Sequence, residues 1–281
     1  MPLFDLVNYF NQRFIEEYGA TENLLFYQNG IATGSYHALQ FGSQLNPVVE
    51  HFFSQRQISL DAQLSQHWHS EKAVSVAHED SSSIINLDRL IRTVHILNFL
   101  PLAHEQHSLF LPVSEHHVIN IRKDHGAYFS DILLRCGLET KKVIITVKLD
   151  HHSRISHQLI LSGLKNYRER GYEIALSLDA NHIHGNDLLI QFLKRLVPDY
   201  IRLPIQLFYN KTPGDVFGRH GLMQTIRRLD TVAVIENIRG PEDMRLAETS
   251  GAHLMTGDYA GLLPTEKSSA PDATGIPMYR R

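Results

Sequence analysis

Short apolar segments alternate with amphipathic segments from about residue 86 onward, and this alternation constrains the fold more than any other feature of the sequence. The expected strands cover residues 108–113, 143–149, 173–178, 200–203, 232–235 and 252–255. The segments between them repeat apolar residues at helical spacing, and Gly137, Gly171 and Gly251 stand where helices are expected to end. Strands that alternate with helices favour parallel pairing through right-handed crossovers. The sequence therefore predicts an α/β protein with a closed, TIM-like (βα)8 barrel.

A separate amphipathic segment precedes this pattern. Phe4, Val7, Phe10, Phe14 and Tyr18 recur at helical spacing and predict an N-terminal helix. The repeating pattern of the barrel has no place for this helix. Its apolar face must therefore be covered by the barrel, by a second copy of the chain or by another protein, so a homodimer is one open alternative.

Two further short segments follow the helix. Residues 24–27 and 35–41 are expected to form a hairpin around Asn29-Gly30. Residues 42–83 show no regular pattern, and their structure and role stay open. Within them, the apolar residues Val49, Phe52 and Phe53 suggest a helix.

The organisation of the chain follows from these segments. We expect an N-terminal helical extension over residues 1–23 and a barrel over residues 24–264. Residues 265–281 combine Ser, Ala, Pro, Gly and charged residues without periodicity, which is typical of a flexible tail.

Composition excludes several classes of protein. The net charge is -3 with neutral histidines, and no stripe of Lys and Arg marks a nucleic-acid surface, so we expect no direct nucleic-acid partner. Cys136 is the single cysteine, which rules out an internal disulfide framework and fits a reducing cytoplasm. No segment reaches the roughly 18 apolar residues that a membrane span needs, so no membrane partner is expected.

The sequence contains 18 histidines, several of them in close pairs. The pairs are His67 and His69, His116 and His117, His151 and His152, and His182 and His184. Two imidazoles two residues apart on a strand face the same side and could share a transition metal. We favour the simpler interpretation of exposed polar residues, because no CxxC or HExxH motif accompanies them, and we expect no metal and no cofactor.

Seven short sequence motifs also follow one another along the chain. They occupy residues 37–39, 110–114, 144–147, 171–180, 198–202, 234–236 and 251–257. Their order resembles the EAL domain, the bacterial phosphodiesterase barrel that opens cyclic di-GMP. In that family the corresponding motifs read Glu-Ala-Leu, Asn-Val-Ser, Thr-Glu, Asp-Asp-Phe-Gly, Pro-Asp-Tyr-Ile-Lys, Ala-Glu and Gly-Ala followed by Gln-Gly. The resemblance covers roughly residues 24–264 and implies a barrel whose first strand runs antiparallel to the others.

Carried over to this sequence, the resemblance implies that catalysis has been lost. Hydrolysis in the family needs two divalent cations held by hard oxygen ligands. The ligand positions are occupied here by His37, Pro112, Val147, Ser177 and Leu178, and proline and valine have no side-chain donor. Glu236 is retained, whereas Arg202, Pro204, Arg239 and Thr256 replace a lysine, an aspartate, a glutamate and a glutamine. Asp179 would supply a second carboxylate only if the register shifted by one residue.

Binding of cyclic di-GMP without hydrolysis is less favoured. Receptors of this family would keep an arginine two residues after the first motif, and that position is Phe41. Arg154, Arg202 or Arg239 could supply a substitute charge. We therefore expect an inactive EAL-like regulatory protein that binds another protein in control of motility, biofilm formation or gene expression. The alternative is a cyclic di-GMP receptor or residual phosphodiesterase.

Overall fold

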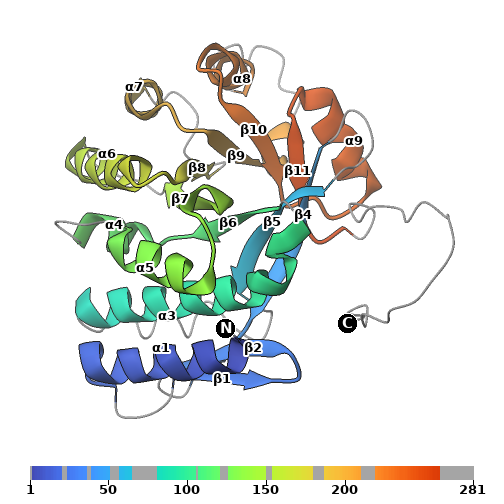
Figure 1. Ribbon diagram of the computed structural model, residues 1–281. Helices are drawn as coiled ribbons and strands as arrows, with labels where there is room; N and C mark the ends of the chain where they lie inside the picture. Colours follow the sequence, from blue (N-terminus) through green and yellow to red (C-terminus); the bar gives the residue numbers. More distant parts are fainter. Residues whose placement is uncertain are drawn as a thin grey trace, which may run out of the picture.

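An eight-stranded closed barrel forms the body of the computed structural model (Figure 1). The structure describes residues 2–20, 24–36, 39–50, 57–64, 81–105, 107–120, 126–149, 154–179, 187–209 and 219–259. The barrel strands are β4 (Ser43–Glu50), β5 (Gln57–Leu64), β6 (Ser108–Pro112), β7 (Val143–Leu149), β8 (Glu173–Leu178), β9 (Tyr200–Pro204), β10 (Val232–Glu236) and β11 (Leu254–Thr256). They are hydrogen-bonded in the order β10-β11-β4-β5-β6-β7-β8-β9. The predicted α/β barrel is confirmed.

The first strand of the barrel runs against the others. β4 pairs antiparallel with β5 and with β11. The remaining neighbours in the barrel pair in parallel. This is the antiparallel first strand that the resemblance implied.

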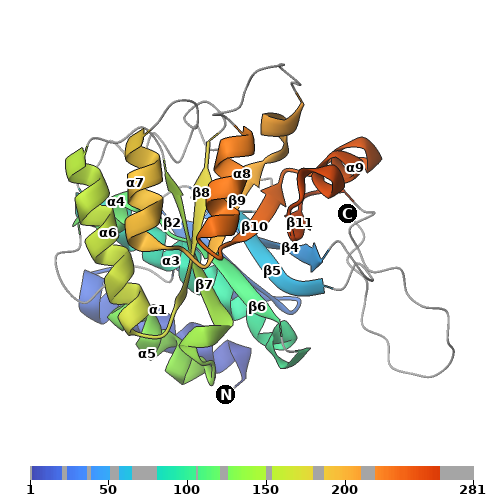
Figure 2. The same ribbon diagram turned by 90° about the horizontal axis from the view of Figure 1, so that it is seen from above.

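Helices surround this barrel (Figure 2). They are α3 (Ser81–Phe99), α4 (Glu115–Asn120), α5 (Ala127–Cys136), α6 (Arg154–Glu169), α7 (Asp187–Leu196), α8 (Arg219–Arg228) and α9 (Pro241–Ser250), with short 3-10 helices η1 (Leu100–Glu105), η2 (Thr140–Lys142) and η4 (Ile205–Phe208). Gly137 and Gly251 end α5 and α9 with φ of 73° and 78°, the left-handed conformation that glycine adopts without steric cost. None of the described helices is long and apolar enough to cross a bilayer.

The barrel interior has its own apolar cluster, separate from the core between strands and helices. It consists of Val48, Phe110, Ile144, Ala175, Val234 and Leu254, each from a different strand, with Tyr200 and Val232 packed against it. Successive side chains of a strand point to opposite faces, so residues two positions further along also point inward. Those residues are polar on several strands, and they include Thr146, Ser177, Arg202 and Glu236. The barrel interior is therefore apolar toward the amino ends of the parallel strands and polar toward their carboxyl ends.

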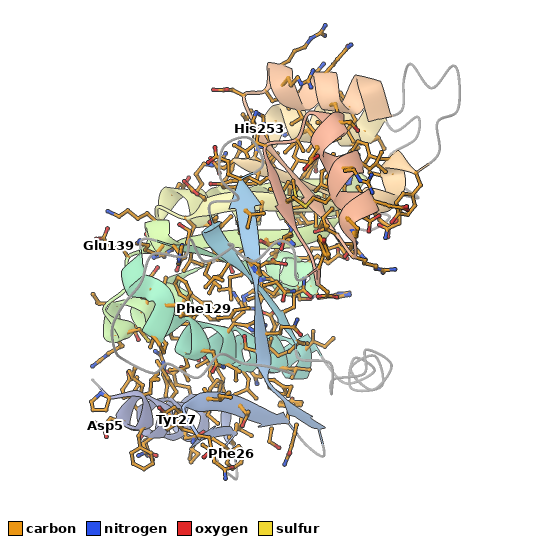
Figure 3. The ribbon with its side chains drawn as sticks, turned by 90° about the vertical axis from the view of Figure 1, so that its right-hand side faces the viewer. Asp5, Phe26, Tyr27, Phe129, Glu139 and His253 are labelled. Atoms are coloured by element: carbon orange, nitrogen blue, oxygen red, sulfur yellow. The ribbon has the colours of Figure 1, made fainter. Side chains whose placement is uncertain are left out.

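The N-terminal elements lie outside the barrel. α1 (Leu3–Tyr18) packs beside a three-stranded sheet of β1 (Leu25–Gln28), β2 (Ile31–Tyr36) and β3 (Leu39–Phe41), and Figure 3 shows these elements as a layer next to α3. Phe10 and Phe14 of α1 are at most 1% exposed. Asn11 donates to the Leu25 carbonyl at 2.8 Å and accepts from the Leu25 amide at 2.8 Å. Most of the apolar face of α1 is thus covered by its own chain, whereas Phe4 at its start stays exposed.

Two expectations for this region need correction. The hairpin forms at Asn29-Gly30, where both residues have positive φ, but its second strand is β2, and the hairpin is not part of the barrel. Residues 42–83, which showed no pattern, contain the first two barrel strands, and Val49 lies on β4 rather than on a helix. The reason is a bulge between Val48 and Val49, which interrupts the alternation expected of a strand. Phe52, Phe53 and the tail 265–281 lie outside the described residues.

Candidate functional site

Four polar side chains converge at the carboxyl ends of the barrel strands. Arg202 on β9 donates from both terminal nitrogens to Asp61 on β5, at 2.5 and 2.9 Å. Its Nε donates to Oε2 of Glu236 on β10 at 2.9 Å. Ser177 on β8 donates to the other oxygen of Glu236, also at 2.9 Å. One guanidinium therefore joins two carboxylates, and a hydroxyl satisfies the second of them.

The charged side chains of this cluster are buried, so the electrostatic interactions between them are strong. The side chains of Asp61 and Arg202 are only 2% and 7% exposed, and that of Glu236 is 16% exposed. Burial by itself would lower the pKa of Arg202, but the carboxylates of Asp61 and Glu236 outweigh it and raise that pKa above the ordinary value. Arg202 is therefore a permanent cation.

Further polar residues extend the site toward the rim. Gln63 donates to Asp61 at 2.9 Å, and Thr256 on β11 donates to the Pro47 carbonyl at 2.9 Å. On the apolar side, the Phe110 ring lies 5.4 Å from the guanidinium carbon of Arg202. Among the residues that the structure describes, no three His, Cys, Asp or Glu side chains gather where they could hold a metal ion.

The structure brings some of the predicted site residues together. Ser177, Arg202 and Glu236 meet in the cluster, and Pro112 and Thr256 end their strands at the same end of the barrel. Asp179 follows β8 and lies 3.8 Å from Lys148 at the rim. Arg239 is exposed in the loop after β10, and its backbone amide donates to Asp243 at 2.9 Å.

Other predicted positions lie elsewhere. Val147 and Leu178 belong to the core between barrel and helices, so they face away from the site. The first motif of the resemblance was matched to residues 37–39, but Leu39 and Phe41 lie on β3 in the N-terminal sheet rather than in the barrel. Phe41 therefore has no part in the barrel end, and His37 lies outside the described residues.

Sequence reasoning missed Asp61. This residue lies on β5, the strand that pairs with β6, and is followed by an alanine, as is the glutamate of the Glu-Ala-Leu motif. The signal was present in the short alternation of residues 58–62, where Ile, Leu and Ala are separated by Ser and Asp. Asp61, the carboxylate in this strand, is the residue that pairs with Arg202.

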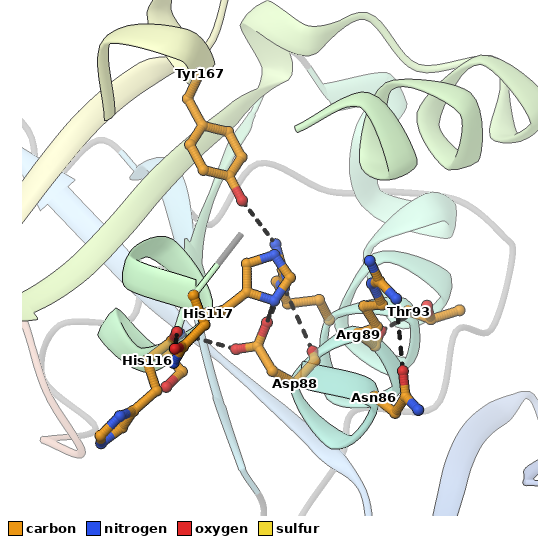
Figure 4. A network of polar contacts seen from close by, with 10 residues as sticks. Asn86, Asp88, Arg89, Thr93, His116, His117 and Tyr167 are labelled. Atoms are coloured by element: carbon orange, nitrogen blue, oxygen red, sulfur yellow. Dashed lines mark hydrogen bonds and ion pairs between the residues drawn. The ribbon is translucent and has the colours of Figure 1, made fainter. Parts of the chain in front are cut away.

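A second buried polar cluster joins α3, α4 and α6 (Figure 4). Arg92, which is fully buried, forms an ion pair with Asp88 and donates to the Tyr167 hydroxyl at 3.3 Å. His117 lies 3.1 Å from Asp88, and the amide of Ser114 donates to Asp88 at 2.8 Å. Asp88 is therefore a buried, paired carboxylate rather than a solvated one. This cluster lies among the helices rather than inside the barrel.

The charges of this second cluster follow from burial and pairing. Burial opposes ionisation of Asp88, yet Arg92 and His117 lower its pKa to about 2. Burial and the positive charge of Arg92 lower the pKa of His117 to about 4, so this histidine is neutral near pH 7. His116 is exposed, whereas its neighbour His117 is buried. The two histidines therefore do not form a metal-binding pair.

Comparisons with known proteins agree with this architecture. No family model and no curated protein match the sequence. Solved structures do match. The YkuI protein of Bacillus subtilis, with an EAL domain in complex with cyclic di-GMP and calcium, has a TM-score of 0.62 at 15% identity, over 77% of this chain and 54% of its own. Klebsiella pneumoniae BlrP1, in a calcium and cyclic di-GMP complex, has a TM-score of 0.62 at 17% identity, over 88% of this chain and 62% of its own.

A third neighbour consists of an EAL domain. The Xanthomonas citri FimX EAL domain in complex with cyclic di-GMP has a TM-score of 0.61 at 11% identity, over 77% of this chain and 85% of its own. The chain spans 54% and 62% of the lengths of the YkuI and BlrP1 chains. At these identities the matches show the fold, and that fold is an EAL-like barrel.

Proposed function

We propose that this protein is a catalytically inactive, EAL-like regulatory protein that acts by binding another protein in the cytoplasm. The observation that carries the proposal is the ion network at the barrel end, where Arg202 holds both Asp61 and Glu236. The neighbouring structures contain cyclic di-GMP, which supports a role in cyclic di-GMP signalling. Control of motility, biofilm formation or gene expression is the proposed role.

The donor set does not fit a pair of divalent cations. Such a pair needs several hard oxygen ligands with free lone pairs and an excess of negative charge. The two carboxylates here accept bonds from a guanidinium, which reduces the charge of the cluster to one negative unit. Pro112 has no side-chain donor, and Val147 and Leu178 face the helices. Among the described residues, too few oxygen ligands remain free to support a mechanism through two metal ions.

Exposed apolar side chains support the binding of another protein. Phe4 on α1 is 59% exposed, Phe26 on β1 is 45% exposed and Leu134 on α5 is 75% exposed. These elements are neighbours, because Asn11 of α1 bonds to β1 and Arg13 of α1 pairs with Asp131 of α5. A second copy of the chain is one candidate partner. Light scattering of the full chain and of a Leu134→Arg variant tests self-association, since the buried face of α1 rules out deletion of that helix as a clean test.

The alternative is a cyclic di-GMP receptor. The ligands in the neighbouring structures favour it, whereas the engagement of Arg202 by two carboxylates leaves that charge unavailable to a phosphate. Calorimetric titration with cyclic di-GMP, with and without Mg²⁺ or Mn²⁺, separates the two functions. We expect no binding heat and no linear product. Binding without product would favour the receptor, and product that disappears in Glu236→Ala would show an active enzyme.

A further inference from the structure

Arg202 spans the interior of the barrel. It lies on β9, and β5 is four strands away from β9 in either direction around the closed sheet, so its bidentate pair with Asp61 joins opposite walls. Its third bond reaches Glu236 on the adjacent strand β10. A single side chain therefore connects three strands at the end where the barrel interior becomes polar.

The guanidinium lies between the carboxylates of Asp61 and Glu236 and bonds to both. Asp61 and Glu236 come from separate strands, and without a positive charge between them, two buried carboxylates would repel each other. A divalent ion and a guanidinium are alternative solutions to this problem, because each can interact with several carboxylate oxygens at once, the ion by coordination and the guanidinium by donating hydrogen bonds. They exclude each other, since both are positive and would occupy the same space.

We propose that Arg202 acts as a built-in cation, which takes the place of a divalent ion between Asp61 and Glu236 and cross-links the barrel end without metal. The inference rests on the proposed function only in treating the barrel end as a site without bound metal. It adds that Asp61 and Glu236 would bind a divalent cation if Arg202 were removed.

Thermal unfolding of wild type and Arg202→Met, each with and without Mn²⁺, tests this inference. Methionine keeps an unbranched apolar stem but has no guanidinium and no charge. We expect the melting temperature of Arg202→Met to fall by about 10 °C, because two buried carboxylates lose their counter-ion. Mn²⁺ at about tenfold above its dissociation constant should then raise it by about 4 °C. Wild type should show no such rise.

Controls connect the rise to these carboxylates. Adding Asp61→Asn to Arg202→Met should abolish the effect of Mn²⁺, and Arg239→Met, which removes an exposed arginine near the same rim, should behave as wild type. A wild-type response that Asp61→Asn removes would overturn the inference, as would a folded Arg202→Met that ignores Mn²⁺. If Arg202→Met folds only with Mn²⁺, the inference is supported; if it folds under neither condition, the ion cannot replace the guanidinium and the inference fails. Wild-type hydrolysis of cyclic di-GMP would refute the proposed function separately.

Discussion

Removing Arg92 should destabilise the protein more than most single substitutions. Arg92 is fully buried, pairs with Asp88, donates to Tyr167 and stacks 3.7 Å above the Phe129 ring. Arg92→Met deletes these interactions and leaves the carboxylate of Asp88 buried without its main counter-ion. Breaking a buried ion pair from one side typically costs about 3–5 kcal/mol. At about 2–4 °C per kcal/mol for a chain of this size, the melting temperature should fall by about 10 °C.

The double variant Asp88→Asn/Arg92→Met separates charge from packing. Asparagine keeps an oxygen for the Ser114 amide, which lies 2.8 Å from Asp88, but it has no charge to desolvate. We therefore expect the double variant to be more stable than Arg92→Met alone, so that the two substitutions are not additive. Calorimetry of wild type, both single variants and the double variant measures this coupling.

The pH dependence of Arg92→Met gives a second measurement. In wild type the charge of Arg92 helps to hold the pKa of Asp88 at about 2. Without that charge, burial dominates and raises this pKa, so Arg92→Met should lose less stability than wild type on acidification. If the single variant loses less than about 1 kcal/mol, or if the double variant is no more stable than the single one, the charge network does not stabilise the fold as argued.

Three further changes test other parts of the structure. Asn11→Ala removes three hydrogen bonds to the backbone of residues 24 and 25 and should lower the free energy of unfolding, measured in urea, by about 2–3 kcal/mol. The control Gln12→Ala changes an exposed residue and should cost less than about 0.5 kcal/mol. Equal effects of the two substitutions would contradict this prediction. Burial lowers the pKa of His95 and His117 from 6.5 to about 4. The unfolded chain therefore takes up protons first, and stability should fall from about pH 6.5 to pH 4; an unchanged slope in a His95→Gln/His117→Gln variant would refute this origin. Gly257→Ala should lower the melting temperature, because a Cβ would lie 2.2 Å from a backbone oxygen; an unchanged value would show that the loop adjusts.

The sequence predicted the later barrel strands well because their composition is simple. β7 and β8 are almost entirely buried and consist mostly of apolar residues, and the helices between the strands carry clear apolar faces. β4 and β5 are different, since they place Asn46, Ser59 and Asp61 at buried positions and β4 contains a bulge. Polar residues inside a barrel look like loop residues in a sequence. This composition concealed both strands and, with them, the carboxylate that pairs with Arg202.

The sequence alone could not show which side chains face the site, because this depends on the register of the strands. Parallel neighbours that are aligned in register point to the same face of the sheet, and Ser177 is aligned with Lys148 on one side and Arg202 on the other. Val147 is aligned with Leu176, so it cannot share a face with Ser177. The residue that β7 directs toward the rim is therefore Lys148, a cation in place of an acidic ligand. With Arg202 deeper in the barrel, this adds positive charge on the face where metal ions would need negative charge.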